Sequence, residues 1–324
     1  MTTWSIAVTA KETLSHTLCF VAYHLELGAS RIFIFLDDPH DVAIAYLKKN
    51  ECVSVVICDG DYWQIQKKTR PLRQEIRQIH NANFAYMRCE EDWLIHMDID
   101  EYLAPYETET SIAKSLSKET HDLIKILPME PLRVDGGDAA LLFHGGYYGD
   151  KQTLSKDLFG KKLHKSLLLE HSRGKCFTRT KLQRTRVMLH RSRMPDEKLR
   201  TQTSRDLRLL HFTSFGVKNW AKKYHHRYNV HELYPFGKSL TKTQQLLSDY
   251  AVFRAIELAI EERGVEAVEN LYRSYKTPLP DKLLKLAGIV DILEFSFSFS
   301  VVLSKYFDFV SNQIDDAPDL FDWD

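Results

Sequence analysis

Short apolar runs alternate with segments of helical spacing through the N-terminal part of the chain. Apolar runs of strand length cover residues 5–9, 31–36, 53–58 and 93–97. Between the first two runs, apolar residues recur at every third or fourth position, and Gly28 stands where a helix C-cap belongs. Strands that alternate with helices in this way are typical of an α/β protein with a largely parallel sheet.

Two further helices are predicted in the same part of the chain. A short one is expected over residues 42–49, and a longer one over residues 71–89, directly before the fourth apolar run. The buried face of the longer helix is assigned to its apolar residues, Ile76, Ile79, Phe84 and Met87. The pattern therefore predicts that the polar positions of this helix face solvent.

The pattern changes further along the chain. Strand and loop character dominates the middle, which includes the glycine-rich segment 135–150, and helical spacing then returns towards the C-terminus. Residues 295–303 alternate like a strand among helical neighbours, so both structures remain open there. We expect a Rossmann-like α/β domain with a mostly parallel central sheet over residues 1–235. A helical C-terminal extension with an acidic tail is expected over residues 236–324.

Composition excludes several classes of protein. Hydrophobic residues make up 44% and charged residues 27% of the chain, which excludes long disorder and collagen-like sequence. No apolar run reaches the roughly 20 residues that a membrane helix needs, and the first residues lack the features of a secretory signal. The 5 cysteines are scattered without a CxxC pair, so we expect reduced thiols and a cytoplasmic location.

Charge is distributed unevenly along the chain. Lysine plus arginine and aspartate plus glutamate both total 44, yet residues 151–230 contain 21 basic and only 5 acidic residues. Such a stretch can attract phosphates, an anionic acceptor or a lipid surface, and it can equally be a solvated basic face. Charge alone does not separate these alternatives.

A pair of carboxylates follows the fourth apolar run. Because side chains alternate along a strand, Asp98 and Asp100 are expected on one face, with Ile99 on the other. Like charges this close repel unless a cation lies between them, and carboxylate oxygens suit Mg²⁺ or Mn²⁺, which would in turn hold a diphosphate. In open α/β sheets, ligands bind outside the carboxyl ends of the strands. The pattern favours a divalent-cation site here, with a metal-free acidic turn as the alternative.

The segment that contains this pair resembles a known motif. Residues 93–103, WLIHMDIDEYL, are similar to the aspartate motif of GT-A glycosyltransferases, in particular the family 2-like group that reads W-x-x-x-x-D-x-D-E-F-L. Other segments resemble the motifs of this group in the same order, and together they cover roughly residues 4–230. They are KET at 11–13, YHLELGA at 23–29, LDDPHD at 36–41, Gly174-Lys175, His190 and LHFTS at 210–214.

The resemblance implies a GT-A fold and a metal-dependent activity. The chain would move a sugar from a nucleotide-diphosphate sugar, with a UDP-sugar favoured, to a hydroxyl of a glycan or lipid-linked acceptor, with inversion. Bacterial surface-polysaccharide synthesis is the setting that the family suggests. The turn at 11–13 reads Lys-Glu-Thr where the family has Lys-Asn-Glu, and residues 38–40 replace an Asn-x-Ser, so the contacts to base and ribose differ there.

The resemblance also implies roles for individual residues. Asp100 would bind Mn²⁺ or Mg²⁺ directly, and Asp98 would reach the donor ribose or a water on the metal, so both are assigned to the metal site. His211 would be a late metal ligand, and a packed strand histidine is the alternative. His24 and His190 are assigned structural roles more readily than functional ones.

Donor-binding residues are expected at the strand ends. Lys11 and Asp37 follow the first two strands, where a nucleotide base and ribose would bind, although ordinary turn chemistry also explains them. Arg73 and Arg77 are one helical turn apart and could contact phosphate or lie on a solvated helix face.

An inverting transfer also needs a general base that deprotonates the acceptor hydroxyl. Glu130, Asp135 and Asp138 lie about as far past the metal motif as related enzymes place this residue. Each of them could equally be a turn-former, and the sequence does not choose among them.

Two other functions compete with the transferase. A metal-dependent phosphohydrolase or nuclease could use the same carboxylates. A non-enzymatic protein could bind nucleic acid or an anionic surface through residues 151–230, but base-stacking motifs are missing, so no nucleic acid is expected as a partner. In the transferase, this stretch could recognise a phosphorylated or lipid-linked acceptor, or touch the inner face of a membrane.

Overall fold

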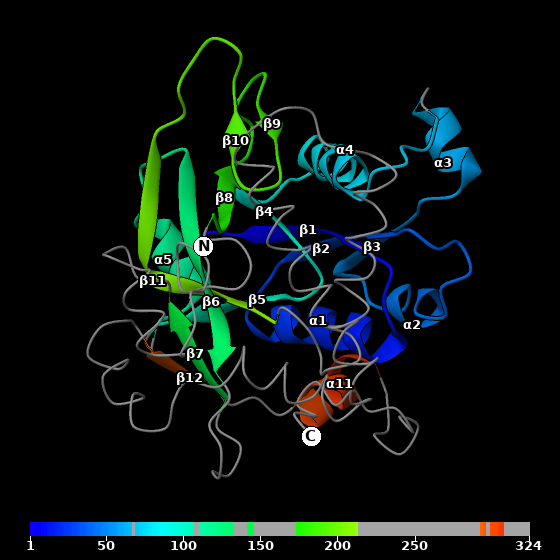
Figure 1. Cartoon of the computed structure of the whole chain (residues 1–324), viewed down its shortest axis with the longest axis horizontal. Helices are drawn as coiled ribbons and strands as arrows, with labels where there is room; N and C mark the ends of the chain where they lie inside the picture. Colours follow the sequence, from blue (N-terminus) through cyan, green and yellow to red (C-terminus); the bar gives the residue numbers. More distant parts are fainter. Residues whose placement is uncertain are drawn as a thin grey trace, which may run out of the picture. The chain divides into compact units, whose positions relative to one another are not determined.

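The structure is a computed structural model, and it describes residues 1–66, 69–106, 110–132, 141–145, 173–212, 292–295 and 299–307. The elements of the N-terminal half are β1 (Trp4–Ala10), α1 (Leu14–Glu26), β2 (Arg31–Leu36), α2 (Ile44–Leu47), β3 (Val53–Ile57), α3 (Gly60–Ile65), α4 (Gln74–Tyr86), β4 (Trp93–Met97), β5 (Glu101–Pro105), α5 (Ile112–Ser117) and β6 (Leu123–Leu132) (Figure 1). They are followed by β7 (Leu141–Gly145), β8 (Lys175–Arg179), β9 (Arg186–Val187), β10 (Ser192–Arg193), β11 (Thr201–His211), β12 (Ile292–Phe295) and α11 (Phe299–Phe307).

The chain divides into two compact units. The first comprises Met1–Met129, His171–His211 and Ser296–Ala317, and the second comprises Glu130–Glu170, Phe212–Phe295 and Pro318–Asp324. In the second unit, β7 and β12 pair antiparallel. The predicted domain boundary at residue 235 and most of the predicted extension over 236–324 lie outside the described residues.

The sheet of the first unit has a parallel part and an antiparallel part. Its strands follow the order β3-β2-β1-β4-β8-β6. The first four are parallel to one another, β8 is antiparallel to both β4 and β6, and β11 pairs antiparallel with β5 and parallel with β6. The predicted α/β class is confirmed, and its parallel sheet is confirmed for β1 to β4, whereas the strands after Asp100 add antiparallel pairs.

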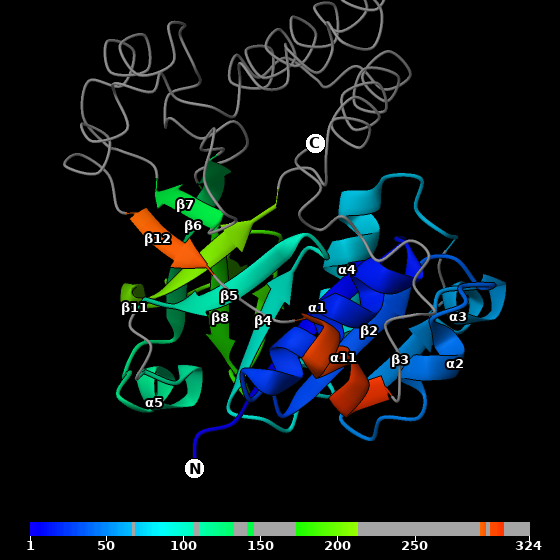
Figure 2. The ribbon, with the colours of Figure 1, turned by 90° about the horizontal axis from the view of Figure 1, so that it is seen from below.

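The parallel strands are apolar because helices cover both of their faces. β1 is buried at every position, as expected for a central strand. Figure 1 shows these strands between α4 on one side and α1 on the other, and Figure 2 gives the view from below. On the α4 side, aromatic and small side chains form a cluster made of Ala7, Phe33, Phe35, Tyr62, Trp63, Ala82, Ala85, Tyr86 and their neighbours. Because both faces of these strands are covered, a ligand can reach them only at their ends.

The buried face of α4 differs from the predicted one. Ile76 is 48% exposed and Met87 is 73% exposed, whereas Arg77, Gln78 and Asn81 are buried. Each of the three polar side chains donates at least one hydrogen bond to a side chain on a strand or loop, which offsets part of the cost of burying it. The assignment of Ile76 and Met87 to the buried face is therefore wrong, because this helix turns polar residues inward.

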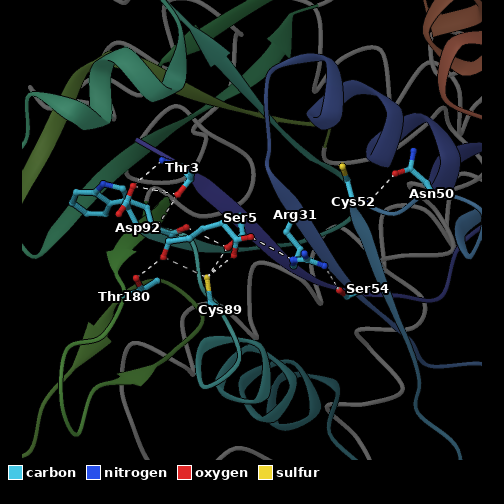
Figure 3. Close-up of polar contacts among 11 residues, drawn as sticks. Thr3, Ser5, Arg31, Asn50, Cys52, Ser54, Cys89, Asp92 and Thr180 are labelled. Carbon is cyan, nitrogen blue, oxygen red and sulfur yellow. Dashed lines mark hydrogen bonds and ion pairs between the residues drawn. The ribbon is translucent and has the colours of Figure 1, made fainter. Parts of the chain in front are cut away.

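The amino ends of the parallel strands are closed by a polar network (Figure 3). The backbone N–H of Thr3 donates to Asp92 Oδ2 at 2.9 Å, and the backbone N–H of Asp92 donates to Thr3 Oγ1 at 3.1 Å. Arg31 links Glu91, at 3.3 Å, to Ser54, at 3.1 Å. These contacts tie together the starts of β1 to β4, and the opposite ends of the strands are left for the candidate site.

Residues 295–303, for which both strand and helix were considered, include the end of a strand and the start of a helix. β12 ends at Phe295, and α11 begins at Phe299. Lys305 and Tyr306 of α11 both contact Glu26 Oε2 of α1, at 2.6 Å and 3.0 Å. A segment near the C-terminus therefore packs on the first helix. In the described part of the chain, no helix is long and apolar enough to cross a membrane.

Candidate functional site

The acidic motif forms a tight turn after β4. β4 ends at Met97, and the backbone N–H of Glu101 donates to the carbonyl oxygen of Asp98 at 3.1 Å, which closes a β-turn. The side chain of Glu101 folds back, and its Oε2 accepts the backbone N–H of Asp98 at 2.8 Å. The predicted strand alternation at Asp98 and Asp100 is therefore wrong, because the chain turns here so that β5 can pair with β11.

A lysine lies between two carboxylates of this turn. Lys175 Nζ is 2.7 Å from Asp98 Oδ2 and 3.3 Å from Glu101 Oε2. Burial of the Lys175 ammonium lowers its pKa, but the charges of Asp98 and Glu101 outweigh burial and hold the pKa above its usual range. The ammonium is therefore charged, and it lies in contact with both carboxylates.

Gly174 explains why Lys175 can reach this position. Gly174 has a φ of +66°, and a Cβ added to it would overlap the backbone oxygen of Ile126. Only glycine permits both this backbone conformation and this close approach. The Gly174 carbonyl contacts His190 Nδ1 at 3.0 Å, and Lys175 starts β8 opposite Ile126. The Gly-Lys pair thus delivers an ammonium to the acidic turn.

Gln78 of α4 holds the second oxygen of Asp98. Its Nε2 donates to Asp98 Oδ1 at 2.6 Å. Each carboxylate oxygen of Asp98 therefore receives a hydrogen bond, one from Gln78 and one from Lys175, while the side chain stays 29% exposed. Asp98 is fixed in orientation and still reachable from solvent.

Glu101 is the most deeply buried carboxylate of the turn. Its side chain has no exposed surface, and burial raises its pKa to about 7 against the opposing charge of Lys175. Among the described residues, no hydrogen-bond donor contacts its Oε1. Glu101 therefore carries one oxygen that is engaged by the turn and one that is not.

β11 brings His211 to Asp100. His211 lies opposite Glu101 in the β5–β11 pairing, and its Nε2 is 3.6 Å from Asp100 Oδ2. The histidine is buried, whereas the Asp100 side chain is 25% exposed. Two residues far apart in the sequence are thus adjacent at the carboxyl end of the sheet.

The chemistry of this pair fits a divalent cation. Two ligands that each lie about 2.1 Å from one ion can be at most about 4.2 Å apart, and the 3.6 Å between Asp100 and His211 is within that limit. In the described part of the chain, no group of three or more His, Cys, Asp and Glu side chains could hold a metal. Mg²⁺ is commonly held by one or two protein ligands together with waters and substrate phosphates, so a two-residue site suffices.

Asp37 forms a second buried carboxylate site after β2. Its Oδ2 accepts hydrogen bonds from Arg70 Nη2 at 2.9 Å and from Arg77 Nη2 at 2.8 Å. Arg77 also donates to the backbone oxygens of Pro71 and Leu72, so it is not on a solvated helix face. Among the described residues, no donor contacts Asp37 Oδ1. Neighbouring residues of α4, Arg77 and Gln78, therefore hold the carboxylates that follow β2 and β4.

Asn81 continues this polar face of α4. Its Nδ2 donates to Thr9 Oγ1 at 2.9 Å, and its Oδ1 accepts from the Tyr62 hydroxyl at 2.8 Å. Gln78, Asn81 and Thr9 are functional-site neighbours for which the sequence pattern predicted no role. The signal that could have identified the helix residues is the polar spacing of 77, 78 and 81, which places them on one helix face.

Tyr23 and His24 of α1 hold the strand that follows the acidic turn. The Tyr23 hydroxyl donates to the Leu103 carbonyl oxygen at 2.6 Å, and the Leu103 N–H donates to His24 Nε2 at 3.3 Å. His24 Nδ1 is 2.8 Å from the Phe20 carbonyl oxygen and donates to it, because Nε2 is the acceptor. The structural role assigned to His24 is confirmed.

Of the remaining predicted site residues, Lys11 and Glu130 lie in the described part of the chain. Lys11 is exposed directly after β1, and Glu130 is buried on β6. Asp135 and Asp138 lie outside the described residues, as does most of the basic stretch 151–230 apart from residues 173–212.

Comparisons with known proteins do not identify the function of this chain. No family model matches the sequence, and no curated protein matches it either. Solved structures that resemble the chain include HddC from Yersinia pseudotuberculosis, with 14% identity, a TM-score of 0.31, and coverage of 63% of this chain and 90% of that one. Another is a putative glucose-1-phosphate thymidylyltransferase from Bacillus anthracis, with 8% identity, a TM-score of 0.30, and coverage of 54% and 71%. Such TM-scores establish neither a shared fold nor a shared activity.

Proposed function

We propose that the chain is a metal-dependent glycosyltransferase of the GT-A type, which moves a sugar from a nucleotide-diphosphate sugar to an acceptor hydroxyl. The observation that carries the proposal is the acidic turn after β4, with Asp100 beside His211 and Asp98 fixed by Gln78 and Lys175. This turn follows a parallel strand, at the edge of the sheet where open α/β proteins bind their ligands.

In this proposal Asp100 and His211 hold Mn²⁺ or Mg²⁺. The cation would supply Lewis-acid stabilisation of the charge that develops on the departing diphosphate. Asp98 faces the donor and accepts a hydrogen bond from a ribose hydroxyl or from a metal-bound water. Its fixed orientation supports this role, because an acceptor that is already aligned loses little entropy on binding.

Lys11 and Asp37 would bind the base and ribose of the donor. Asp37 Oδ1 is buried and contacts no donor among the described residues, so it can accept an N–H or O–H from a ligand. Arg77 is engaged by Asp37 and by two backbone oxygens. Its part in donor binding is therefore to position Asp37.

The transfer itself is a substitution at the anomeric carbon. The acceptor oxygen forms the new C–O bond, the bond between sugar and diphosphate breaks, and the nucleoside diphosphate leaves with the electron pair. A carboxylate takes the proton of the acceptor hydroxyl. Glu130, Asp135 and Asp138 are the candidates, and the inverting course remains part of the proposal.

The acceptor in this proposal is a glycan or a lipid-linked molecule. The basic stretch 151–230 would recognise its phosphate groups or touch an anionic membrane at the cytoplasmic face. A UDP-sugar is the favoured donor, and no nucleic acid takes part.

Calorimetric titration with UDP and with GDP, each with and without Mn²⁺, tests the proposal. Wild-type protein should bind one of the two nucleotides, and Mn²⁺ should strengthen binding at least tenfold. Asp100→Asn should remove this dependence on Mn²⁺. Asp196→Asn is the matched control, because the Asp196 side chain is 69% exposed and lies outside the site.

Two results would count against the proposal. One is that neither nucleotide binds in any condition, and the other is that Asp100→Asn binds with the same Mn²⁺ dependence as wild type. Hydrolysis of a phosphodiester substrate by the wild-type protein, abolished in Asp100→Asn, would instead favour the phosphohydrolase.

A further inference from the structure

The two-stranded ribbon of β9 and β10 places two arginines directly opposite each other. Arg186 of β9 pairs with Arg193 of β10 in the antiparallel register, and both residues are exposed. Residues in this relation have Cβ atoms roughly 4.5–5.5 Å apart, and like charges at that separation destabilise the strand pair. Among the described residues, no carboxylate forms an ion pair with either arginine. The fold therefore holds two facing positive charges that lack a counter-charge within the described part of the chain.

The opposite face of the ribbon is buried, which points the arginines outward. Val187 belongs to the apolar cluster on the α4 side of the sheet, and Ser192, which lies opposite it, is also buried. Because side chains alternate along a strand, Arg186, Arg191 and Arg193 lie on the outer face of the ribbon. All three are exposed. These three residues form the arginine face of the ribbon.

Hydrogen bonds to α4 and β8 hold the ribbon in place (Figure 1). Asn83 of α4 donates to the Val187 carbonyl oxygen at 2.8 Å and accepts the N–H of the same residue at 3.0 Å. The hydroxyls of Ser192 and of Thr178, on β8, are 2.7 Å apart. A binding group on a backbone that is already fixed loses less entropy when its ligand arrives. The ribbon is therefore a preformed support for the arginine face.

The end of the ribbon is linked to the acidic turn after β4. His190 Nδ1 is 3.0 Å from the Gly174 carbonyl oxygen, and the residue after this glycine, Lys175, contacts Asp98 Oδ2 at 2.7 Å. Arg191 directly follows His190. The arginine face thus begins next to the candidate site and continues away from it along the ribbon.

The charge of the ribbon matches a phosphate group. Residues 179–193 contain six lysines and arginines and no aspartate or glutamate. A guanidinium group binds phosphate oxygens through two parallel N–H···O bonds. A phosphate between Arg186 and Arg193 would also remove the repulsion between them, because its negative charge lies between the two positive ones.

We propose that the arginine face binds a phosphate group of the acceptor, so that the acceptor is a molecule that carries a phosphate or a diphosphate. Arg186 and Arg193 hold this phosphate between them, and Arg191 contacts it on the side of the acidic turn. The inference rests on the proposed function, in which the donor diphosphate is assigned to the cation at Asp100 and His211. A phosphate on the ribbon therefore belongs to the other substrate.

Calorimetric titration of the full chain with inorganic pyrophosphate, without divalent cations, tests the inference. Wild-type protein should bind pyrophosphate, and Arg186→Gln/Arg193→Gln should bind it at least about tenfold more weakly, because it lacks two of the guanidinium groups. Lys198→Gln/Arg205→Gln is the matched control, since it removes the same charge at two exposed positions outside the ribbon. The affinity of this control should stay within about threefold of wild type.

Thermal unfolding shows whether the arginine variant is folded. Arg186→Gln/Arg193→Gln removes the facing charges, so its unfolding temperature at low ionic strength should equal or exceed that of wild type. Pyrophosphate should raise the unfolding temperature of wild type and leave that of the variant unchanged, because a ligand stabilises only the protein that binds it. An equal rise in both proteins would overturn the inference.

A further variant separates the ribbon from the donor site. Asp100→Asn should bind pyrophosphate within about threefold of wild type, and Arg186→Gln/Arg193→Gln should keep the wild-type affinity for UDP with Mn²⁺. Loss of pyrophosphate binding in Asp100→Asn would place the pyrophosphate at the donor site and overturn the inference. Failure of the wild type to bind UDP or GDP would contradict the proposed function, whereas the result with pyrophosphate would be unaffected.

Sedimentation with vesicles separates an acceptor phosphate from a membrane surface. The vesicles contain phosphatidylcholine with or without phosphatidylserine. Binding of wild type to the anionic vesicles but not to pyrophosphate, lost in Arg186→Gln/Arg193→Gln, would make the ribbon a membrane contact and overturn the inference. Equal weakening of pyrophosphate binding in the two double variants would overturn it as well, because general charge attraction would then explain the result.

Discussion

The imidazole of His24 accepts a hydrogen bond from the backbone N–H of Leu103, at 3.3 Å. This contact joins the first helix to the strand that leaves the acidic turn, and the Tyr23 hydroxyl binds the carbonyl oxygen of the same residue, at 2.6 Å. Both backbone groups of Leu103 are thus held by α1. Since β5 begins at Glu101, the position of the acidic turn depends on this pair of helix residues.

Removing the Tyr23 hydroxyl should destabilise the protein. Tyr23→Phe leaves a buried carbonyl oxygen without this donor, and we expect a loss of about 1–2 kcal/mol in the free energy of unfolding. Urea denaturation measures it. Tyr106→Phe is the control, because Tyr106 is 39% exposed, and its effect should stay below about 0.5 kcal/mol. Equal effects of the two substitutions would contradict the role of Tyr23.

His24 should make stability depend on pH. Burial lowers its pKa from the usual 6.5 to about 3 in the folded protein. Below pH 6.5 the unfolded chain takes up a proton that the folded protein excludes, so stability is lost as the pH falls towards 3. Tyr23 and Tyr102, whose rings pack against His24, stay neutral throughout because burial raises their pKa.

The measurement compares wild type with His24→Gln between pH 6.5 and pH 4. The wild-type free energy of unfolding should fall more steeply, by up to about 1.4 kcal/mol per pH unit for this one proton. Parallel curves for the two proteins would show that His24 is not held neutral.

Three glycine-to-alanine substitutions should differ in their effect on stability, with the cost rising in the order Gly60, Gly28, Gly174. Gly60→Ala meets nothing within 4 Å and lies in a helix, so it should be neutral or stabilising by up to about 1 kcal/mol. Gly28→Ala meets open space but has a φ of +88°, which costs about 1–2 kcal/mol. Gly174→Ala adds a backbone clash to a positive φ and should cost the most. Thermal unfolding ranks the three, and a mild Gly174→Ala would contradict the close packing on Ile126.

Gln78 should matter for donor binding more than for folding. Gln78→Leu removes the hydrogen bond to Asp98 Oδ1, and we expect about tenfold weaker UDP binding in the presence of Mn²⁺. Glu75→Gln, at a half-exposed position of the same helix, should bind like wild type. If calorimetry gives equal affinities for the two variants, Asp98 does not depend on Gln78.

The parallel strands could be predicted because their apolar pattern is visible in the local sequence alone. A strand buried on both faces reads as a nearly continuous apolar run. β2 is apolar from Ile32 to Leu36, and β1 is interrupted only by Ser5 and Thr9. The place of Asp98 after β4 could be predicted for the same reason. The turn that follows could not, because it depends on the Glu101 side chain folding back to the Asp98 N–H.

The polar face of α4 was missed because periodicity treats polar residues as solvent-facing. Gln78 and Asn81 are buried against partners on other elements, Asp98 and Thr9, and no local pattern encodes those partners. Lys175 was named in the Gly174-Lys175 match and counted within the basic stretch 151–230, but neither pattern placed its ammonium at the acidic turn. A buried charge is recognised only when the opposite charges that satisfy it are known.

The Asp100–His211 pair could be predicted in part. The resemblance to GT-A enzymes suggested His211, but the β5–β11 pairing that brings it to Asp100 joins distant parts of the chain. Pairings of this kind follow from the tertiary fold and not from strand propensity.

The most direct test of the proposed glycosyl transfer is to determine which bond of a sugar nucleotide the protein cleaves. A panel of UDP- and GDP-sugars is incubated with Mn²⁺ and the wild-type protein, Asp100→Asn or the control Asp196→Asn, and the nucleotide products are separated by chromatography. A glycosyltransferase releases UDP or GDP, since it breaks the bond between sugar and diphosphate. We expect this product from wild type and the control, and at least a hundredfold less from Asp100→Asn. Release of UMP or GMP together with a sugar phosphate would place the cleavage within the diphosphate and contradict the account.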